Sequence, residues 1–306
     1  MTGVQTCALP ISYPSPEKHG NPVIRLAING YGRIGRSVLR ALYESSHRDE
    51  ISIVAVNELA DKTTAAHLTR YDSTHGRFPL VVEETAAGFS VDGQEIILYC
   101  SETIDALPWS ALGIDLVLEC TGSFTDRATA EQHLRSGARK VLFSQPAEAD
   151  VDATIVYGIN HGELVAEHQV VSNASCTTNG IVPVIRALDD ALGVESGVIT
   201  TIHSAMNDQP VLDAYHHTDL RKTRAAGHSI IPVDTLLARG IERILPGFGG
   251  RLEAQALRVP TLNVSAMDLT VVVARDTTVE EVNRCLAKAA SSLFEGVLGY
   301  SEEPLA

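Results

Sequence analysis

The chain has 306 residues, of which 44% are hydrophobic and 20% charged, which is long and apolar enough to bury the cores of two domains. Its formal net charge of -14 argues against a nucleic-acid partner, because phosphate backbones are bound mainly by clustered Lys and Arg. The apolar runs are strand-sized and shorter than the roughly 18 to 20 residues of a membrane span, so no membrane partner is expected. A small anionic ligand remains compatible with this charge, since one arginine or one helix N-terminus can hold a phosphate.

The five cysteines are scattered through the chain. They are Cys7, Cys100, Cys120, Cys176 and Cys285. They form no CxxC pair and no closely spaced Cys/His set, so neither a disulfide scaffold nor a metal site is expected. Free thiols at such spacing are typical of a reducing compartment. We therefore expect a cytoplasmic protein in which a lone cysteine is either structural or catalytic.

The first 22 residues do not have the pattern of a folded domain or of a signal peptide. A basic start followed by a long apolar core is missing, and four prolines disfavour regular structure. We therefore predict a disordered or artefactual leader over residues 1–22, with the first folded element beginning at Val23.

A strand, a glycine turn, a helix and a second strand are predicted next. An apolar run over residues 23–29 is followed by GYGRIG, an amphipathic stretch and a second apolar run over residues 51–58. Later apolar runs alternate with helix-like stretches such as residues 127–136. These later runs lie at residues 116–121, 140–144 and 154–160. The alternation predicts an α/β fold with a doubly wound, mostly parallel sheet.

The glycine turn matches the GxGxxG pattern of dinucleotide-binding sites. The candidate cofactor residues in it are Gly30, Gly32, Arg33, Ile34 and Gly35. Because the turn follows a strand and opens a helix, its backbone amides can approach a pyrophosphate. A glycine turn without a ligand is the alternative interpretation.

An acidic residue ends the second strand of this unit. Glu58 lies roughly 20 residues beyond the glycines, where a carboxylate can accept hydrogen bonds from ribose hydroxyls and repel a 2′-phosphate. The alternative is a solvated acid at a strand end. We interpret the whole unit as a Rossmann domain that binds NAD rather than NADP.

Cys176 lies at the predicted start of a helix. A strand through Ser172 precedes it, and apolar residues at helical spacing follow from Ile181 to Leu192. Unpaired amides and the positive end of the helix dipole favour a thiolate at such a position. Cys176 is therefore a candidate nucleophile, with a buried structural cysteine as the alternative.

The pattern changes near residue 173, where the β-rich runs become longer. We expect an NAD-binding domain over residues 23–174 and a catalytic α+β domain over residues 175–306, built on a mixed, largely antiparallel sheet. Apolar residues at helical spacing from Val279 to Leu293 predict a helix that packs one face on this sheet.

Motifs along the chain resemble those of the glyceraldehyde-3-phosphate dehydrogenase family, in family order. They are NGYGRIGR at 29–36, YDSTHGRF at 71–78, ECTG at 119–122, ASCTTN at 174–179, SIIPVDT at 229–235 and RVPTLNVS at 258–265. The resemblance implies that Cys176 attacks an aldehyde, that a hydride passes to NAD, and that a thioester remains. It also implies that His203 is the base for the thiol, although a histidine at a strand end is more often structural. A homotetramer is implied as well.

The resemblance further implies contacts with a sugar phosphate. They are carried over to Ser175, Thr177, Lys222, Thr235 and Arg258. Arg258 is the expected phosphate holder, because a guanidinium can bind phosphate through two hydrogen bonds. Lys222 stands where the family generally has arginine, so its contact is expected to differ.

Two positions differ from the glyceraldehyde 3-phosphate enzymes. Met206 replaces a threonine and cannot donate a hydroxyl group, and Leu236 replaces a glycine at an anion-binding corner. These changes resemble the branch that oxidises D-erythrose 4-phosphate to 4-phosphoerythronate, with water resolving the thioester, in pyridoxal phosphate biosynthesis. Two alternatives are a phosphorylating glyceraldehyde-3-phosphate dehydrogenase and an inactive NAD-binding fragment. The second is kept because the sequence stops at Ala306, before the family's final strand and helix.

Overall fold

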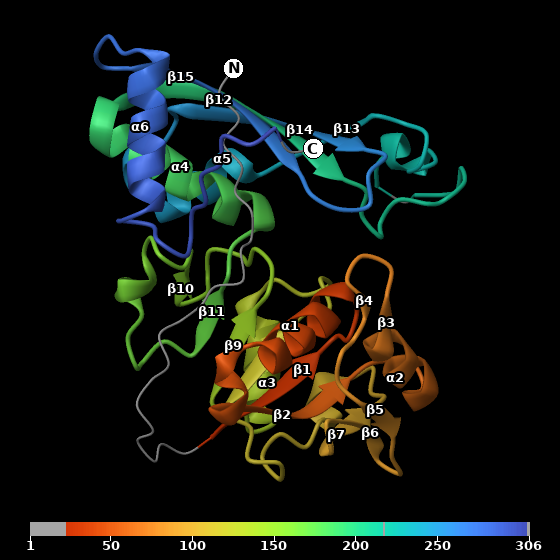
Figure 1. Ribbon diagram of the computed structural model, residues 1–306. Coiled ribbons are helices and arrows are strands. Elements are labelled where there is room, and N and C mark those ends of the chain that lie inside the picture. The colour runs from red at the N-terminus through yellow and green to blue at the C-terminus, as the bar shows by residue number, and fades with distance from the viewer. Residues whose placement is uncertain (1–22, 217, 305–306) are drawn as a thin grey trace. The chain divides into compact units, whose positions relative to one another are not determined.

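The computed structural model describes residues 23–216 and 218–304 (Figure 1). The predicted leader at residues 1–22 lies outside the described residues. The described chain divides into two compact units. The N-terminal unit comprises residues 23–155 and 162–174, and the C-terminal unit comprises residues 156–161 and 175–304.

The N-terminal unit is built on one sheet of nine described strands. In sheet order they are β10 (Ala153–Thr154), β11 (Val170–Ser172), β9 (Lys140–Phe143), β8 (Leu116–Glu119), β1 (Ile24–Asn29), β2 (Ile51–Asn57), β7 (Gln94–Tyr99), β6 (Gly88–Val91) and β5 (Val82–Glu84). The pairings from β10 to β7 are parallel, and β6 and β5 add an antiparallel edge. The predicted doubly wound α/β fold is confirmed.

Helices cover both faces of this sheet. They are α1 (Arg33–Glu44), α2 (Lys62–Arg70) and α3 (Arg127–Arg135), and a short hairpin of β3 (Tyr71–Asp72) and β4 (Gly76–Arg77) follows α2. Successive residues of β1 point to opposite faces, as the period of two in a strand requires. Leu26 and Ile28 therefore join the core under α1 and α2, whereas Ala27 joins the core under α3.

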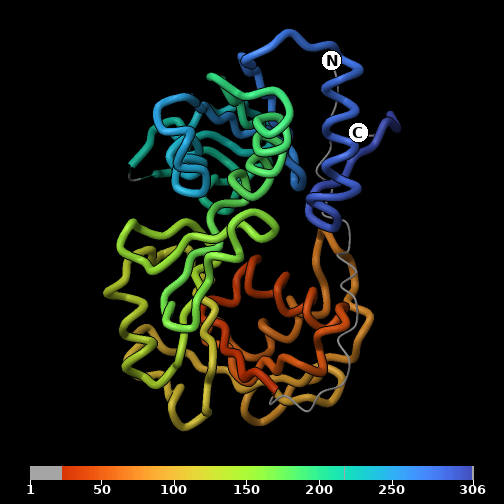
Figure 2. Tube along the Cα trace, turned by 90° about the vertical axis from the view of Figure 1, so that its left-hand side faces the viewer, coloured from red at the N-terminus to blue at the C-terminus, as the bar shows by residue number. Residues whose placement is uncertain are grey.

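The C-terminal unit has a smaller sheet. In sheet order its strands are β13 (Ile231–Val233), β14 (Leu252–Val259), β12 (Val194–Ser204) and β15 (Ala266–Val273). The β12–β14 pair is parallel, and the two outer pairs are antiparallel, so the predicted mixed, largely antiparallel sheet is confirmed. Its helices are α4 (Cys176–Leu192), α5 (Leu237–Ile244) and α6 (Val279–Ala290). The whole trace can be followed in Figure 2, which ends in the blue segment that contains α6.

Two local predictions differ from the structure. The helix predicted up to Leu293 ends at Ala290, and it packs beside α4 rather than on the sheet. Its fully buried face is small, since only Leu286 and Ala289 are buried within it, and this face suits a neighbouring helix better than a sheet.

The strand predicted at residues 154–160 is almost absent. Only Ala153 and Thr154 pair in the sheet. The Asn160 side chain then accepts a hydrogen bond from the Val156 amide at 2.8 Å, and Gly158 has a φ of +86°. An Asn side chain that bonds to nearby backbone competes with a sheet ladder, so the chain turns here.

Among the described residues, no helix combines the length and the apolar character needed to cross a lipid bilayer.

Candidate functional site

Cys176 is the first residue of α4, as predicted. Ser175 caps the helix, because its hydroxyl oxygen accepts a hydrogen bond from the Thr178 amide at 3.0 Å. Ala174 has a φ of +56°, a left-handed conformation that is uncommon outside glycine. This sharp turn between β11 and α4 leaves the Cys176 thiol exposed at the positive end of the helix.

His203 lies beside this thiol, near the end of β12. The distance from Cys176 Sγ to His203 Nε2 is 3.6 Å. His203 Nδ1 lies 2.8 Å from the backbone oxygen of Ser204. A carbonyl oxygen only accepts, so Nδ1 carries the proton and Nε2 of the neutral ring is free to accept the thiol proton. The ring is therefore oriented so that Nε2 can accept a proton from Cys176 Sγ.

The two groups shift each other's pKa in directions that favour proton transfer. The hydrogen bond from His203 lowers the pKa of the Cys176 thiol, while partial burial opposes the change. The same hydrogen bond raises the pKa of His203, against partial burial and the positive charge of Arg258. Both changes stabilise a thiolate next to an imidazolium, which is the reactive form of a nucleophilic cysteine.

Two cationic side chains near Cys176 and His203 form ion pairs with the same carboxylate. Arg258 on β14 is the register partner of His203 on β12. Its Nη1 lies 3.5 Å from Asp208 Oδ1, and Lys222 Nζ lies 2.8 Å from Asp208 Oδ2. The Arg258 side chain is only 13% exposed, and within the described chain its buried Nη1 has no hydrogen-bond partner. A buried guanidinium donor that has an ion-pair partner but no hydrogen-bond partner is suited to an anionic ligand.

The other predicted substrate residues are engaged in local structure. The Ser175 hydroxyl, which caps α4, lies 3.1 Å from the Thr177 hydroxyl. Thr235 precedes α5, and its hydroxyl accepts a hydrogen bond from the Leu237 amide at 3.2 Å. The structure therefore connects Cys176, His203, Arg258 and Lys222 in one group, while the hydroxyls of Ser175, Thr177 and Thr235 make the local contacts just described.

Asp208 was missed by the sequence analysis. It holds both cations, and these interactions, together with the charges of Lys222 and Arg258, keep the pKa of its carboxyl group below the usual value despite burial. The available signal was an acidic residue shortly after the end of β12 (Val194–Ser204), the strand that carries His203. That signal is weak, because its partners lie 14 and 50 residues further along the chain.

In the glycine turn of the N-terminal unit, a side chain would have no space at Gly30, whereas the space beside Gly32 is open. Gly30 has a φ of +88°, and a Cβ atom there would lie 2.5 Å from the Thr121 backbone nitrogen. Around Gly32, which precedes α1, a Cβ atom would meet nothing within 4 Å. The space above Gly32 and the free amides of the first turn of α1 fit a pyrophosphate.

Glu58 is held at the rim of the same cavity. Its two carboxylate oxygens each accept a backbone amide, from Tyr31 at 2.8 Å and from Leu59 at 2.8 Å. Each oxygen keeps a second lone pair for a ligand hydroxyl. The cavity has a volume of about 320 Å³ and is lined by Gly30, Gly32 and Glu58 among others. These residues fit a dinucleotide.

The side chains of Arg33 and Ile34 lie outside the cavity that Gly30 and Gly32 line. The Arg33 guanidinium pairs with Asp72 at 2.9 Å, which ties the glycine turn to the β3–β4 hairpin. Ile34 is 51% exposed. Arg33, Ile34 and Gly35 are not among the residues that line the cavity. Among the described residues, no group of His, Cys, Asp and Glu side chains is arranged to hold a metal ion.

Family models match both units. Residues 24–127 match the NAD binding domain of glyceraldehyde 3-phosphate dehydrogenase, and residues 175–306 match its C-terminal domain. The chain belongs to the glyceraldehyde 3-phosphate dehydrogenase family. It is therefore an NAD-dependent oxidoreductase, and NAD is its cofactor. The predicted family and cofactor are confirmed.

Proposed function

We propose that this family member oxidises a phosphorylated aldehyde with NAD through a thioester on Cys176. The observation that carries the proposal is the 3.6 Å contact between Cys176 Sγ and His203 Nε2, on a ring whose Nδ1 faces a carbonyl oxygen. A cysteine and a base oriented by a third group form an activated nucleophile. In this proposal residues 23–174 bind NAD and residues 175–306 carry the catalytic groups.

The chain's own residues would act as follows. His203 Nε2 takes the thiol proton, and Cys176 Sγ forms a bond to the aldehyde carbon, giving a thiohemiacetal. The first-turn amides of α4 and the imidazolium lie where they can stabilise the oxyanion. Bound NAD would supply the hydride acceptor that oxidises this carbon by two electrons, which would leave a thioester on Cys176. After the imidazolium has lost its proton to solvent, His203 deprotonates a water that attacks the thioester carbon. The C–S bond then breaks, the free acid leaves, and the Cys176 thiolate recovers a proton from His203.

Arg258 and Lys222 are the proposed holders of the substrate phosphate. Asp208 fixes both side chains, so their positions are set before the ligand binds. Preorganised cations bind a phosphate with less loss of side-chain entropy than free ones. The two cations on Asp208 therefore support a substrate that carries a phosphate group.

We propose D-erythrose 4-phosphate as that substrate and 4-phosphoerythronate as the product, for pyridoxal phosphate biosynthesis in the cytoplasm. Met206 and Leu236 support this choice, because both carry exposed apolar side chains, 45% and 72% exposed, where the sequence resemblance implies donors for a second anion. Each lost hydrogen bond to a charged group is worth about 1.5–3 kcal/mol, so inorganic phosphate should bind poorly beside the acyl carbon. Water then becomes the acyl acceptor.

The test is NADH formation from erythrose 4-phosphate with and without millimolar inorganic phosphate. We expect a similar rate in both conditions and a free acid as product. Glyceraldehyde 3-phosphate is the comparison substrate and should give the lower kcat/KM. A strict need for inorganic phosphate would instead support a phosphorylating glyceraldehyde-3-phosphate dehydrogenase. If NAD binds but neither aldehyde yields NADH, the inactive alternative is favoured.

We also propose that the protein is a homotetramer. Several large apolar side chains in the C-terminal unit are almost fully exposed, including Val211 and Leu262 at 84% each. Clusters of exposed apolar residues commonly mark protein interfaces. Sedimentation at micromolar concentration is expected to give a mass about four times that of the 32.8 kDa chain, and a single species of one-chain mass would rule the tetramer out.

A further inference from the structure

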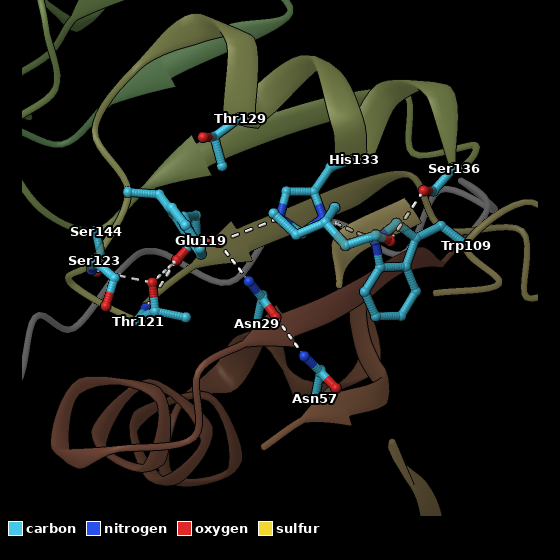
Figure 3. A network of polar contacts seen from close by, with 12 residues as sticks. Asn29, Asn57, Trp109, Glu119, Thr121, Ser123, Thr129, His133, Ser136 and Ser144 are labelled. Atoms are coloured by element: carbon cyan, nitrogen blue, oxygen red, sulfur yellow. Dashed lines mark hydrogen bonds and ion pairs between the residues drawn. The ribbon is translucent and has the colours of Figure 1, made fainter. Parts of the chain in front are cut away.

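A charged residue ends a strand that is otherwise apolar. Glu119 is the last residue of β8 (Leu116–Glu119), and its exposed fraction is 0%. A buried carboxylate is costly unless hydrogen bonds replace its water. Figure 3 shows that polar side chains of the N-terminal unit converge on it.

Four donors face the two carboxylate oxygens. Oε2 accepts from Asn29 Nδ2 at 2.6 Å and lies 3.2 Å from His133 Nε2. Oε1 accepts from the Thr121 amide at 2.9 Å and from the Thr121 hydroxyl. That hydroxyl itself accepts from the Ser123 amide at 3.2 Å, so its proton points at Glu119. The carboxylate therefore acts only as an acceptor, which suits its ionised form.

The direction of the histidine bond is fixed by the sole tryptophan of the chain. Trp109 Nε1 donates to His133 Nδ1 at 3.0 Å, and an indole N–H cannot accept. A proton on Nδ1 would face this donor, so Nε2 carries the ring proton and donates it to Glu119. His133 is fully buried and takes part as a neutral donor.

The orientation of the two asparagine amides is fixed as well. Asn57 Oδ1 accepts from the Ser101 amide at 2.9 Å, so its Nδ2 is free to donate to Asn29 Oδ1 at 2.8 Å. Asn29 must then present its own Nδ2 to Glu119. If either amide were flipped, two donors or two acceptors would face each other. From the Ser101 amide, which follows β7, through Asn57 and Asn29, each group therefore donates a hydrogen bond to the next, and Glu119 is the last acceptor.

This network lies under the dinucleotide cavity. Asn29, Asn57, Ser101 and Thr121 all line the cavity, whereas Glu119 does not. Thr121 also lies against the glycine turn, since its backbone nitrogen lies 2.5 Å from the Cβ position at Gly30. Through Thr121, and through Asn29 and Asn57 in turn, the carboxylate is thus linked to the ends of β1, β2, β7 and β8, which form walls of the cavity.

We propose that Glu119 is a positioning residue for NAD. Its carboxylate holds Thr121 and Asn29 so that the walls of the cavity match the dinucleotide before it binds. The proposal rests on NAD binding by the N-terminal unit and not on aldehyde oxidation. Binding measured by calorimetry therefore tests it even if the proposed substrate is wrong.

The first test is Glu119→Gln in the full chain. All four neighbouring groups, which belong to Asn29, His133 and Thr121, are donors, so the amide NH₂ must face at least one donor in either orientation. We expect the Kd for NAD to rise roughly tenfold or more, measured by calorimetry at a temperature where the variant is folded. Trp109 fluorescence reports folding in the same samples. The matched control is Glu95→Gln, the same change at an exposed position of β7, and its Kd should equal that of the wild type.

The second test distinguishes positioning from general destabilisation. Asn29→Asp alone places a second carboxylate 2.6 Å from Glu119 and should also weaken NAD binding. In the double variant Asn29→Asp/Glu119→Gln, donor and acceptor are exchanged and the net charge of the pair is restored. We expect the double variant to bind NAD more tightly than either single variant, with partial recovery because His133 still faces a donor.

Two results would overturn the proposal. One is a folded Glu119→Gln protein whose Kd equals that of the Glu95→Gln control. The other is a double variant that binds NAD more weakly than both single variants. If Glu119→Gln does not fold, Thr121→Val removes only the hydroxyl donor and should raise the Kd about threefold to tenfold. An unchanged Kd in that variant would also count against the proposal.

Discussion

Cys176→Ser is expected to lower kcat/KM for the aldehyde by at least about a thousandfold while leaving NAD binding intact. A serine hydroxyl has a far higher pKa than a thiol, so neither the dipole of α4 nor His203 can supply a comparable nucleophile. Loss of the covalent step removes the thioester, and only catalysis by binding and orientation remains. Initial rates of NADH formation measure the effect, and calorimetry with NAD shows whether the cofactor site is intact.

The other cysteines provide the control. Burial raises the pKa of the Cys120 thiol to about 11, and burial also raises that of Cys285. Brief treatment with iodoacetamide should therefore label Cys176 before Cys120 and Cys285 and abolish turnover. Cys285→Ser keeps a donor for the Ala187 carbonyl oxygen and should retain full activity. Turnover that survives complete labelling of Cys176 would refute its role as nucleophile.

The parts of the site that the sequence predicted are those determined by neighbours in the chain. The glycine turn between β1 and α1 follows from local glycine spacing and from the switch between two periodicities. The helix start at Cys176 was predicted from the strand through Ser172 and from the apolar spacing between Ile181 and Leu192. Both features depend on a few consecutive residues, so the sequence alone was sufficient.

The contacts that the sequence could not predict join residues far apart in the chain. Asn29 and Glu119 are 90 residues apart, and they meet because β1 and β8 are register partners. The order of strands in the sheet is not encoded in any local pattern. One sequence feature did point to Glu119, because a carboxylate follows three apolar residues in a four-residue strand. This feature does not indicate which residues the carboxylate contacts.

Charged side chains were the least predictable part. The GxGxxG pattern indicated Arg33 for the cofactor site but did not indicate the partner of its side chain, which is Asp72. A long flexible side chain goes to the partner that the tertiary structure provides, and motif position does not determine this choice. The same reasoning applies to Asp208, whose role is visible only once Lys222 and Arg258 lie beside it.

The pH dependence of thiol reactivity depends on His203 in a direction that can be worked out. A thiolate exists above the pKa of its thiol, and the hydrogen bond from His203 is the largest cause that lowers this pKa in Cys176. His203→Asn removes that bond and the imidazolium charge, while partial burial, which raises the thiol pKa, remains. The alkylation rate of His203→Asn by iodoacetamide should therefore follow a pH profile that is shifted to higher pH relative to the wild type.

Turnover should fall together with this change. His203→Asn is expected to reduce kcat by about 10²–10⁴, the usual effect of losing a general base, because the thiol proton and the water proton both lose their acceptor. The matched control is His228→Asn, at an exposed position of the same unit, which should keep the wild-type rate and the wild-type alkylation profile.

The decisive comparison is between the alkylation profiles of His203→Asn and of the wild type from pH 5 to 10. Because the wild-type pair shares one proton between sulfur and Nε2, its profile reports the pair rather than either residue alone. A His203→Asn profile that overlays the wild type would show that the 3.6 Å contact does not activate the thiol, and the proposed mechanism would then lose its base.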